Sequence, residues 1–220
     1  SFDTGQMARL LAHDNHETRA GLKALFRDPL FTPRYAVTLP EERELALQRL
    51  QQICAHGLIS VRDFRDNPRR IFSVHEVVGM VDGSTATKMT VQFNLFGGTV
   101  LKLGSARHET YLDDIDALEL VGCFGLTELG FGNNAVEMRT TATYEADTDS
   151  FVIHTPEPMA RKYWITNGSV HAHIAIVFAQ LTIEGKEEGI HAFLVPIRDA
   201  EMNPLPGVTI WDMGHKMGCN

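Results

Sequence analysis

Residues 121–134, VGCFGLTELGFGNN, and residues 162–168, KYWITNG, decide how this chain is interpreted. Each combines a segment typical of a strand with a segment typical of a loop. The first stretch begins where the apolar pattern changes from helical spacing to strand-like alternation, near residues 118–121. We therefore place a domain boundary there, and we expect the two stretches to hold one flat cofactor.

The first stretch ends in a glycine-rich loop, residues 127–134. Gly130 and Gly132 allow backbone amides to face a ligand without obstruction by side chains. Thr127 offers a hydroxyl, and Asn133 offers an amide. The motif is not a dinucleotide-binding fingerprint, because it lacks a third glycine and no βαβ pattern surrounds it. By composition alone, a plain turn is the alternative.

The second stretch places the indole of Trp164 two residues before the hydroxyl of Thr166. On an extended strand, these two side chains would share a face. The indole could then pack against a flat ring, and the hydroxyl could bond a ring heteroatom. The alternative is a core tryptophan followed by a turn threonine. Glu128, the one carboxylate in the glycine-rich loop, is interpreted as a cap for backbone amides rather than a base.

The composition sets the outer limits of function. A chain of 220 residues can bury one large core or two small ones. Its formal net charge of −8 argues against a nucleic-acid partner. The three cysteines are far apart, and an odd number gives no complete disulfide framework. No run approaches the roughly 18–20 apolar residues of a membrane span.

Three histidines suggest a metal site. His171 and His173 have the spacing that lets alternate strand residues chelate zinc or copper, and His191 follows. No carboxylate or cysteine spacing completes such a site. We therefore expect structural or surface roles for these histidines and no metal.

The first half of the chain is predicted to be an all-helical domain, residues 1–118. Apolar spacing together with proline and glycine punctuation predicts helices over residues 6–12, 15–26, 40–57, 68–82, 84–103 and 106–117. The segment 84–103 is apolar on all sides, which is typical of a central helix. Gly97 and Gly98 within it allow a kink or a close backbone approach.

The second half is predicted to be a β-domain, residues 119–220. Alternating segments predict strands at 140–144, 151–154, 175–181, 191–197 and 208–210, separated by turn signals. Several short strands at this spacing favour an antiparallel barrel or sandwich. The predicted fold class is therefore α+β.

Taken in order, these segments resemble the acyl-CoA oxidase family, within the acyl-CoA dehydrogenase superfamily. The segments that carry the resemblance are RDPLFTPRY (27–35), NLFGG (94–98), LGSARH (103–108), CFGLTELGFGNN (123–134), TTATYEADTDSFVIHTP (140–156), KYWITNG (162–168), FAQLTIEGKEEGIHAFLVPIRD (178–199) and PGVTIWDMGHKMGCN (206–220). The family fold has an N-terminal helical domain, a middle β-domain and a C-terminal helical region. We expect residues 1–220 to supply the first two and to lack the third.

The resemblance implies an FAD site between the middle domain and the C-terminal helices. Thr127 would contact the pyrimidine side of the flavin, and Gly132 and Asn133 would lie near the FAD phosphates. Trp164 would cover one flavin face, and Thr166 would reach the ring near its hydride-accepting nitrogen. Asn133 stands where a small hydroxyl residue is common in the family, which leaves its phosphate contact open.

The resemblance also implies a flavoprotein oxidoreductase of fatty acid β-oxidation. It would oxidise fatty acyl-CoA to trans-2-enoyl-CoA and pass electrons to dioxygen, giving hydrogen peroxide. The acyl chain would lie along the central helix, with Phe93, Leu95 and Gly98 as pocket residues. The catalytic glutamate belongs to the C-terminal region, so no residue of this chain is assigned as catalytic. The family implies a homodimer or larger assembly, in the peroxisome if eukaryotic and in the cytoplasm if bacterial.

Two alternatives stay open. KYWITNG resembles the dehydrogenase version of this segment, since many oxidases carry a glycine near position 166. The chain could therefore belong to an acyl-CoA dehydrogenase that uses an electron-transfer flavoprotein. It could also be a non-catalytic subunit that binds acyl-CoA or flavin.

Overall fold

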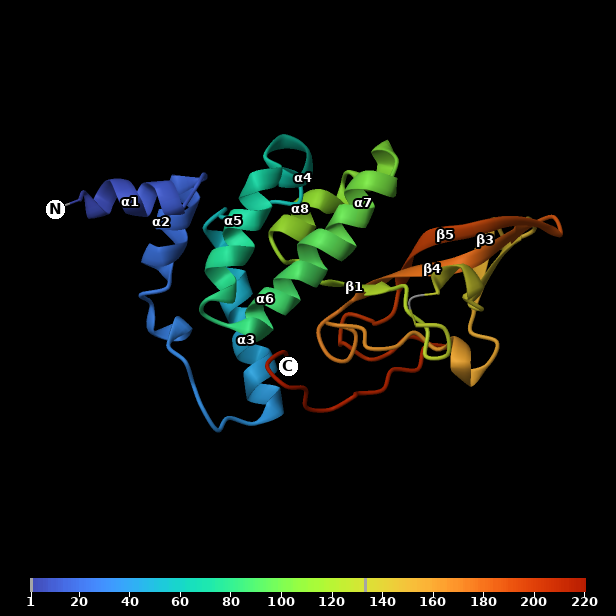
Figure 1. The fold of residues 1–220 in the computed structure, drawn as a ribbon. Helices are drawn as coiled ribbons and strands as arrows, with labels where there is room; N and C mark the ends of the chain where they lie inside the picture. Colours follow the sequence, from blue (N-terminus) through green and yellow to red (C-terminus); the bar gives the residue numbers. More distant parts are fainter. Residues whose placement is uncertain (1, 133) are drawn as a thin grey trace. The chain divides into compact units, whose positions relative to one another are not determined.

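The structure is a computed structural model, and it describes residues 2–132 and 134–220. By internal contacts the chain forms two compact units (Figure 1). The helical unit comprises Ser1–Leu120 together with Gly214–Asn220, and the β-unit comprises Val121–Met213. The predicted domains 1–118 and 119–220 stay a prediction; the last residues of the chain group with the helices.

The helices of the helical unit overlap the segments predicted from apolar spacing and from proline and glycine punctuation, except for α4, which was not predicted. They are α1 Thr4–Leu11, α2 His16–Leu25, α3 Leu39–Ala55, α4 Asp63–Asp66, α5 Pro68–Gly79, α6 Gly83–Met89, α7 Gly98–Leu103 and α8 Tyr111–Asp116. Local chemistry sets the ends. At the start of α3, Thr38 and Glu41 form a capping box, with the Glu41 carboxylate accepting from the Thr38 amide at 2.8 Å.

The central helix runs without interruption from α6 to α7 (Figure 1). Between them lies η2, Thr90–Gly97, whose turns are π-helical. A Cβ on Gly97 would lie 2.7 Å from Cγ2 of Val61 and 3.2 Å from Cγ2 of Ile115, so only glycine permits this approach. The buried side-chain amide of Gln92 joins this helix to the end of the helical unit by donating to the Leu120 carbonyl at 2.8 Å. The predicted helix is therefore confirmed, and close packing accompanies its wide turns.

The two neighbouring glycines of this helix give a matched test of packing. We expect Gly97→Ala to lower the free energy of unfolding by about 1–3 kcal/mol, because the new methyl overpacks the core. At Gly98 the nearest atom to an added Cβ is the Phe93 carbonyl oxygen at 3.4 Å. There the higher helix propensity of alanine is expected to dominate, so Gly98→Ala should be neutral or stabilising by up to about 1 kcal/mol. Denaturant titration of both variants measures the difference; equal effects would contradict this packing account.

The last residues of the chain lie against helices α3 and α6. Asn220 donates from Nδ2 to the Glu42 carboxylate at 2.9 Å, and its backbone amide donates to the Ser84 hydroxyl at 3.2 Å. A Cβ on Gly83 would lie 2.6 Å from the carbonyl oxygen of Gly218. A glycine at the start of α6 is therefore what lets this segment pack there.

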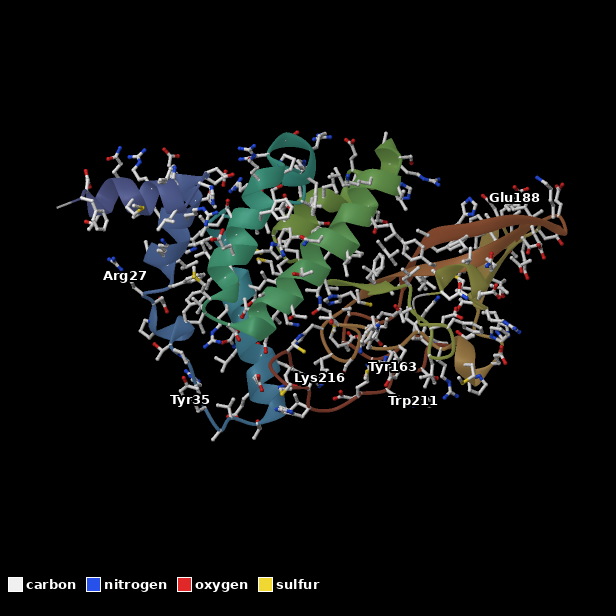
Figure 2. All side chains as sticks on the ribbon, in the orientation of Figure 1. Arg27, Tyr35, Tyr163, Glu188, Trp211 and Lys216 are labelled. Carbon is white, nitrogen blue, oxygen red and sulfur yellow. The ribbon has the colours of Figure 1, made fainter. Side chains whose placement is uncertain are left out.

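The β-unit is built around one long strand. Its strands are β1 Gly122–Gly125, β2 Thr141–Glu145, β3 Ser150–His154, β4 Ile174–Ile183 and β5 Lys186–Pro196. One edge of β4 pairs with β5 in an antiparallel hairpin, and Glu188 lies in β5 near the tip of that hairpin (Figure 2). β1 and β2 both pair with β4 in the parallel sense, and β3 is antiparallel to β2.

The predicted antiparallel barrel or sandwich is therefore wrong in its pairing, although the α+β class is confirmed. The described strands form one mixed sheet, and they do not close into a barrel. Alternation of apolar residues reports that a segment is a strand, and it carries no information on the direction of its partner. The pairing depends on how distant segments meet.

The strand predicted at 208–210 is also wrong, since none of the described strands includes these residues. Val208 and Ile210 instead pack as irregular backbone against the buried cluster that includes Cys123, Ala175 and Ile197. Their alternation reflects burial against a sheet face rather than pairing within it. In the described part of the chain, no helix is long and apolar enough to cross a membrane.

Candidate cofactor site

The loop after β1 and the segment 162–168 lie side by side in the β-unit. The amide of Tyr163 donates to the carbonyl of Thr127 at 3.0 Å, and the amide of Leu129 donates to the carbonyl of Arg161 at 2.9 Å. The loop after β1 and the segment before Trp164 therefore run antiparallel to each other. Figure 2 labels Tyr163 on this segment. The pairing brings Thr127 close to the Trp164 backbone.

Glu128 joins these segments from inside. Its carboxylate, with a residue exposure of 2%, accepts from the Arg139 amide at 2.8 Å and the Thr140 amide at 2.9 Å. It also accepts from the Thr140 hydroxyl at 2.6 Å and from Lys162 Nζ at 3.0 Å. Lys162 further donates to the Leu126 carbonyl at 3.2 Å. The interpretation of Glu128 as a cap for backbone amides is confirmed.

The surroundings of Glu128 favour its charged form. Burial alone would raise the pKa of Glu128, but hydrogen bonds from Thr140, Arg139 and Lys162 outweigh it and hold the pKa below its ordinary value. Burial lowers the pKa of Lys162, and the Glu128 carboxylate opposes that shift. Glu128 is therefore a carboxylate at neutral pH whose acceptor positions are already used. It holds structure rather than taking a proton.

Trp164 departs from the predicted geometry. The expectation that Trp164 and Thr166 share the face of an extended strand is wrong, because Trp164 has φ 53° and Thr166 begins a turn. Ile165, between them, packs against the buried cluster that includes Cys123, and Asn167 continues the turn at φ 67°. A bulky residue in the left-handed region costs about 1–2 kcal/mol. The indole is nevertheless 64% exposed, so the loop holds it outward at an energetic cost.

The hydroxyls of Thr127 and Thr166 are available. Within the described residues, neither the Thr127 nor the Thr166 hydroxyl has a hydrogen-bond partner, and both residues are partly buried. Gly132 is exposed at φ 51° with open space where a side chain would be. Asn133 lies outside the described residues. An exposed indole and two available hydroxyls on these paired segments are the kinds of group that bind a flat ring with polar atoms on its rim.

Two residues outside the predicted site hold the turn that follows Trp164. Asn167 donates from Nδ2 to the Gly122 carbonyl at 3.1 Å, which joins the turn to β1. Arg198, just beyond β5, bonds the carbonyls of the same turn. Neither Asn167 nor Arg198 was predicted from the sequence. The one available signal was the position of Arg198 directly after the mainly apolar segment 190–197.

The central helix carries the predicted substrate residues in different environments. Phe93 is fully buried at 0% exposure, Gly98 is buried, and Leu95 is 36% exposed. Leu95 is therefore the most accessible of the three. Their role at an acyl pocket stays a prediction.

The histidines do not gather into a metal-ligand cluster. In the described residues, no group of three or more His, Cys, Asp or Glu side chains could hold a metal. His191 Nδ1 lies 3.2 Å from the Gly189 carbonyl, and Nδ1 of His173 is buried without a partner.

The sheet with its paired loops defines a known class of domain. Residues 123–220 match the family model described as acyl-CoA dehydrogenase, middle domain. This match includes both stretches of the candidate site. These residues therefore form an acyl-CoA dehydrogenase middle domain.

Individual proteins that the chain resembles are acyl-CoA oxidases. The chain is 42% identical over 205 residues to acyl-coenzyme A oxidase 2, peroxisomal, of Arabidopsis thaliana, covering 88% of this chain and 29% of that protein. It is 40% identical over 201 residues to peroxisomal acyl-coenzyme A oxidase 3 of Homo sapiens, covering 90% and 29%. The crystal structure of acyl-CoA oxidase1 from Yarrowia lipolytica superposes with a TM-score of 0.83 at 30% identity, covering 95% of this chain and 31% of that one.

The chain belongs to the acyl-CoA oxidase family. It spans about a third of the length of the relatives that it matches.

Proposed function

We propose that this chain is part of a flavoenzyme that oxidises fatty acyl-CoA to trans-2-enoyl-CoA in fatty acid β-oxidation, with dioxygen as electron acceptor and hydrogen peroxide as product. The observation that carries the proposal is the pairing of the Thr127 loop with the Trp164 segment, which brings an exposed indole and two available hydroxyls into one part of the β-unit. Family membership over nearly the whole chain supports the same activity.

The residues present fit FAD. The indole of Trp164 offers an apolar surface of the right kind for the isoalloxazine ring, and the hydroxyls of Thr127 and Thr166 offer bonds to its polar rim. Gly132 and Asn133 are the proposed neighbours of the phosphates. When bound, FAD would accept the β-hydride of the substrate and deliver the electrons to dioxygen. The chain's own part is to bind the cofactor and fix its orientation.

Structures of relatives support this choice of cofactor and substrate. An acyl-CoA oxidase-2 structure from Caenorhabditis elegans is bound with FAD, ascaroside-CoA and ATP, and the chain is 27% identical to it with a TM-score of 0.79. We propose that the acyl chain of the substrate contacts the central helix at Leu95, with Phe93 and Gly98 shaping the wall behind it.

The proton-abstracting base is proposed to lie outside residues 1–220. The chain spans about a third of its relatives, and Glu128 is saturated by its donors. We further propose a homodimer or larger assembly. Its location would be the peroxisome in a eukaryote, as the names of the plant and human relatives indicate, and the cytoplasm in a bacterium.

The activity is tested with the complete gene product that carries residues 1–220. We expect it to be yellow, to bleach when fatty acyl-CoA is added without oxygen, and to recolour in air with stoichiometric hydrogen peroxide. Absorption spectroscopy and a peroxide assay measure both steps. A colourless protein that takes up no FAD would refute the proposal.

A dehydrogenase that passes electrons to an electron-transfer flavoprotein is the second candidate. It is favoured by the threonine at position 166, whose side chain could narrow the approach of oxygen to the flavin. Bleaching by substrate followed by slow recovery in air, without peroxide, would select this candidate over the oxidase. A protein that binds flavin and acyl-CoA but never bleaches would instead be a non-catalytic subunit.

A further inference from the structure

We propose that Arg198 is a positioning residue for the flavin site, because its guanidinium holds the turn that orients Trp164 and Thr166. The inference rests on the proposed function, since it names a residue that shapes the same site without touching the cofactor.

The contacts of Arg198 are concentrated on one turn. Nη1 donates to the Ala172 carbonyl at 2.6 Å, and Nη2 donates to the Gly168 carbonyl at 2.8 Å and the Ser169 carbonyl at 2.9 Å. Three carbonyls within five successive residues thus converge on one planar group. A guanidinium presents several N–H groups in a fixed fork, and an ammonium on a flexible stem cannot reproduce that arrangement.

Arg198 is itself fixed to the sheet. The amides of Ile197 and Arg198 donate to the His173 carbonyl at 2.9 Å and 3.3 Å. The backbone of Arg198 also forms an isolated antiparallel β-bridge with Pro204. The Arg198 side chain therefore connects the end of β5 to the turn that follows Trp164.

The placement of this cation is energetically unfavourable on its own. Arg198 is only 8% exposed, and no carboxylate among the described residues pairs with it. Burial lowers its pKa. A buried charge that is balanced only by carbonyl dipoles costs more than an apolar side chain of similar size. Core packing alone therefore gives no reason for an arginine here.

The backbone conformation of the turn after Trp164 gives a reason for an arginine at position 198. Trp164 at φ 53° and Asn167 at φ 67° both occupy the left-handed region. Strained backbone persists only where surrounding contacts over-determine it. The three carbonyl bonds of Arg198 and the bond from Asn167 to Gly122 supply that constraint on residues 167–172, which follow the exposed indole in the chain.

The test compares variants of the complete FAD-loaded protein. Arg198→Lys keeps the charge and loses the fork, whereas Arg198→Met loses both. The matched control is Lys186→Met, which removes an exposed cation near the tip of the hairpin. We expect both Arg198 variants to raise the FAD dissociation constant at least tenfold and to weaken quenching of flavin fluorescence, and the control to change neither.

A double-mutant cycle with Trp164→Asn separates positioning from general stability. If Arg198 acts through the Trp164 loop, its substitution should weaken FAD binding far less in the Trp164→Asn background than in the wild type. Full additivity, or Arg198 variants that melt earlier yet bind FAD with unchanged affinity and spectrum, would overturn the inference. Should Arg198→Met not fold, Arg198→Lys decides the cycle. A wild-type protein that binds no FAD would refute the proposed function and this inference with it.

Discussion

Replacing Trp164 with asparagine is expected to weaken FAD binding while leaving the cofactor-free protein as stable as before, or more stable. The backbone of Trp164 has φ 53°, and the residue is 64% exposed. Asparagine tolerates the left-handed region, so the substitution relieves roughly 1 kcal/mol of strain and loses little buried surface. Loss of the ring contact should raise the FAD dissociation constant roughly tenfold or more.

The two effects have opposite signs, which makes the test specific. Thermal unfolding of the cofactor-free protein and an FAD titration measure them on the same samples. Trp211 is the matched control for strain, because it is 65% exposed, is not in the left-handed region and stacks on Arg161 at 4.2 Å. Trp211→Asn is not expected to raise stability. A Trp164→Asn protein that is clearly less stable, or that binds FAD as tightly as the wild type, would contradict the proposed role.

Removing the Glu128 carboxylate is expected to have the largest effect on stability in the β-unit. In Glu128→Ala, Lys162 is left as an unpaired cation whose side chain is only 15% exposed, and the amides of Arg139 and Thr140 lose their acceptor. Breaking a buried pair in this way lowers the free energy of unfolding by about 3–5 kcal/mol. Glu157→Ala is the control, because that carboxylate is 43% exposed and lies 3.6 Å from Arg139. It should change stability by less than about 1 kcal/mol.

The Glu128 carboxylate should also make the free energy of unfolding depend on pH in the acid range. The pKa of Glu128 is lower in the folded protein than its ordinary value of 4.5, so its stabilising contribution is complete above pH 4.5 and is lost as pH falls through the folded pKa. The stability difference between the wild type and Glu128→Gln should therefore shrink in acid. Denaturant titrations across this pH range measure it. A difference that stays constant, or grows, as pH falls would show that the carboxylate charge does not contribute.

The sequence predicts the helices well because their signals are local. The capping box at Thr38 and Glu41 and the prolines at 40 and 68 act within one turn of the helix that they begin. The π-helical turns of η2 could not be predicted in the same way. They accompany the packing of Gly97 against Val61 and Ile115, which are distant in sequence.

The β-unit shows the same limit more strongly. Period-two alternation located β2 to β5, but the parallel pairing of β1 and β2 with β4 is set by contacts between distant segments. Arg198 likewise bonds the carbonyls of Gly168, Ser169 and Ala172 from a distant part of the chain, and no local pattern connects it to them. The adjacency of the Thr127 and Trp164 segments was predicted and is confirmed; their roles toward FAD stay a prediction.

The most direct measurement is a crystal structure of the complete protein with FAD. The account predicts that the indole of Trp164 lies in van der Waals contact with the isoalloxazine ring. It also predicts that the hydroxyls of Thr127 and Thr166 bond the polar rim. A flavin bound elsewhere, or bound here with the indole turned away and both hydroxyls unbonded, would contradict it.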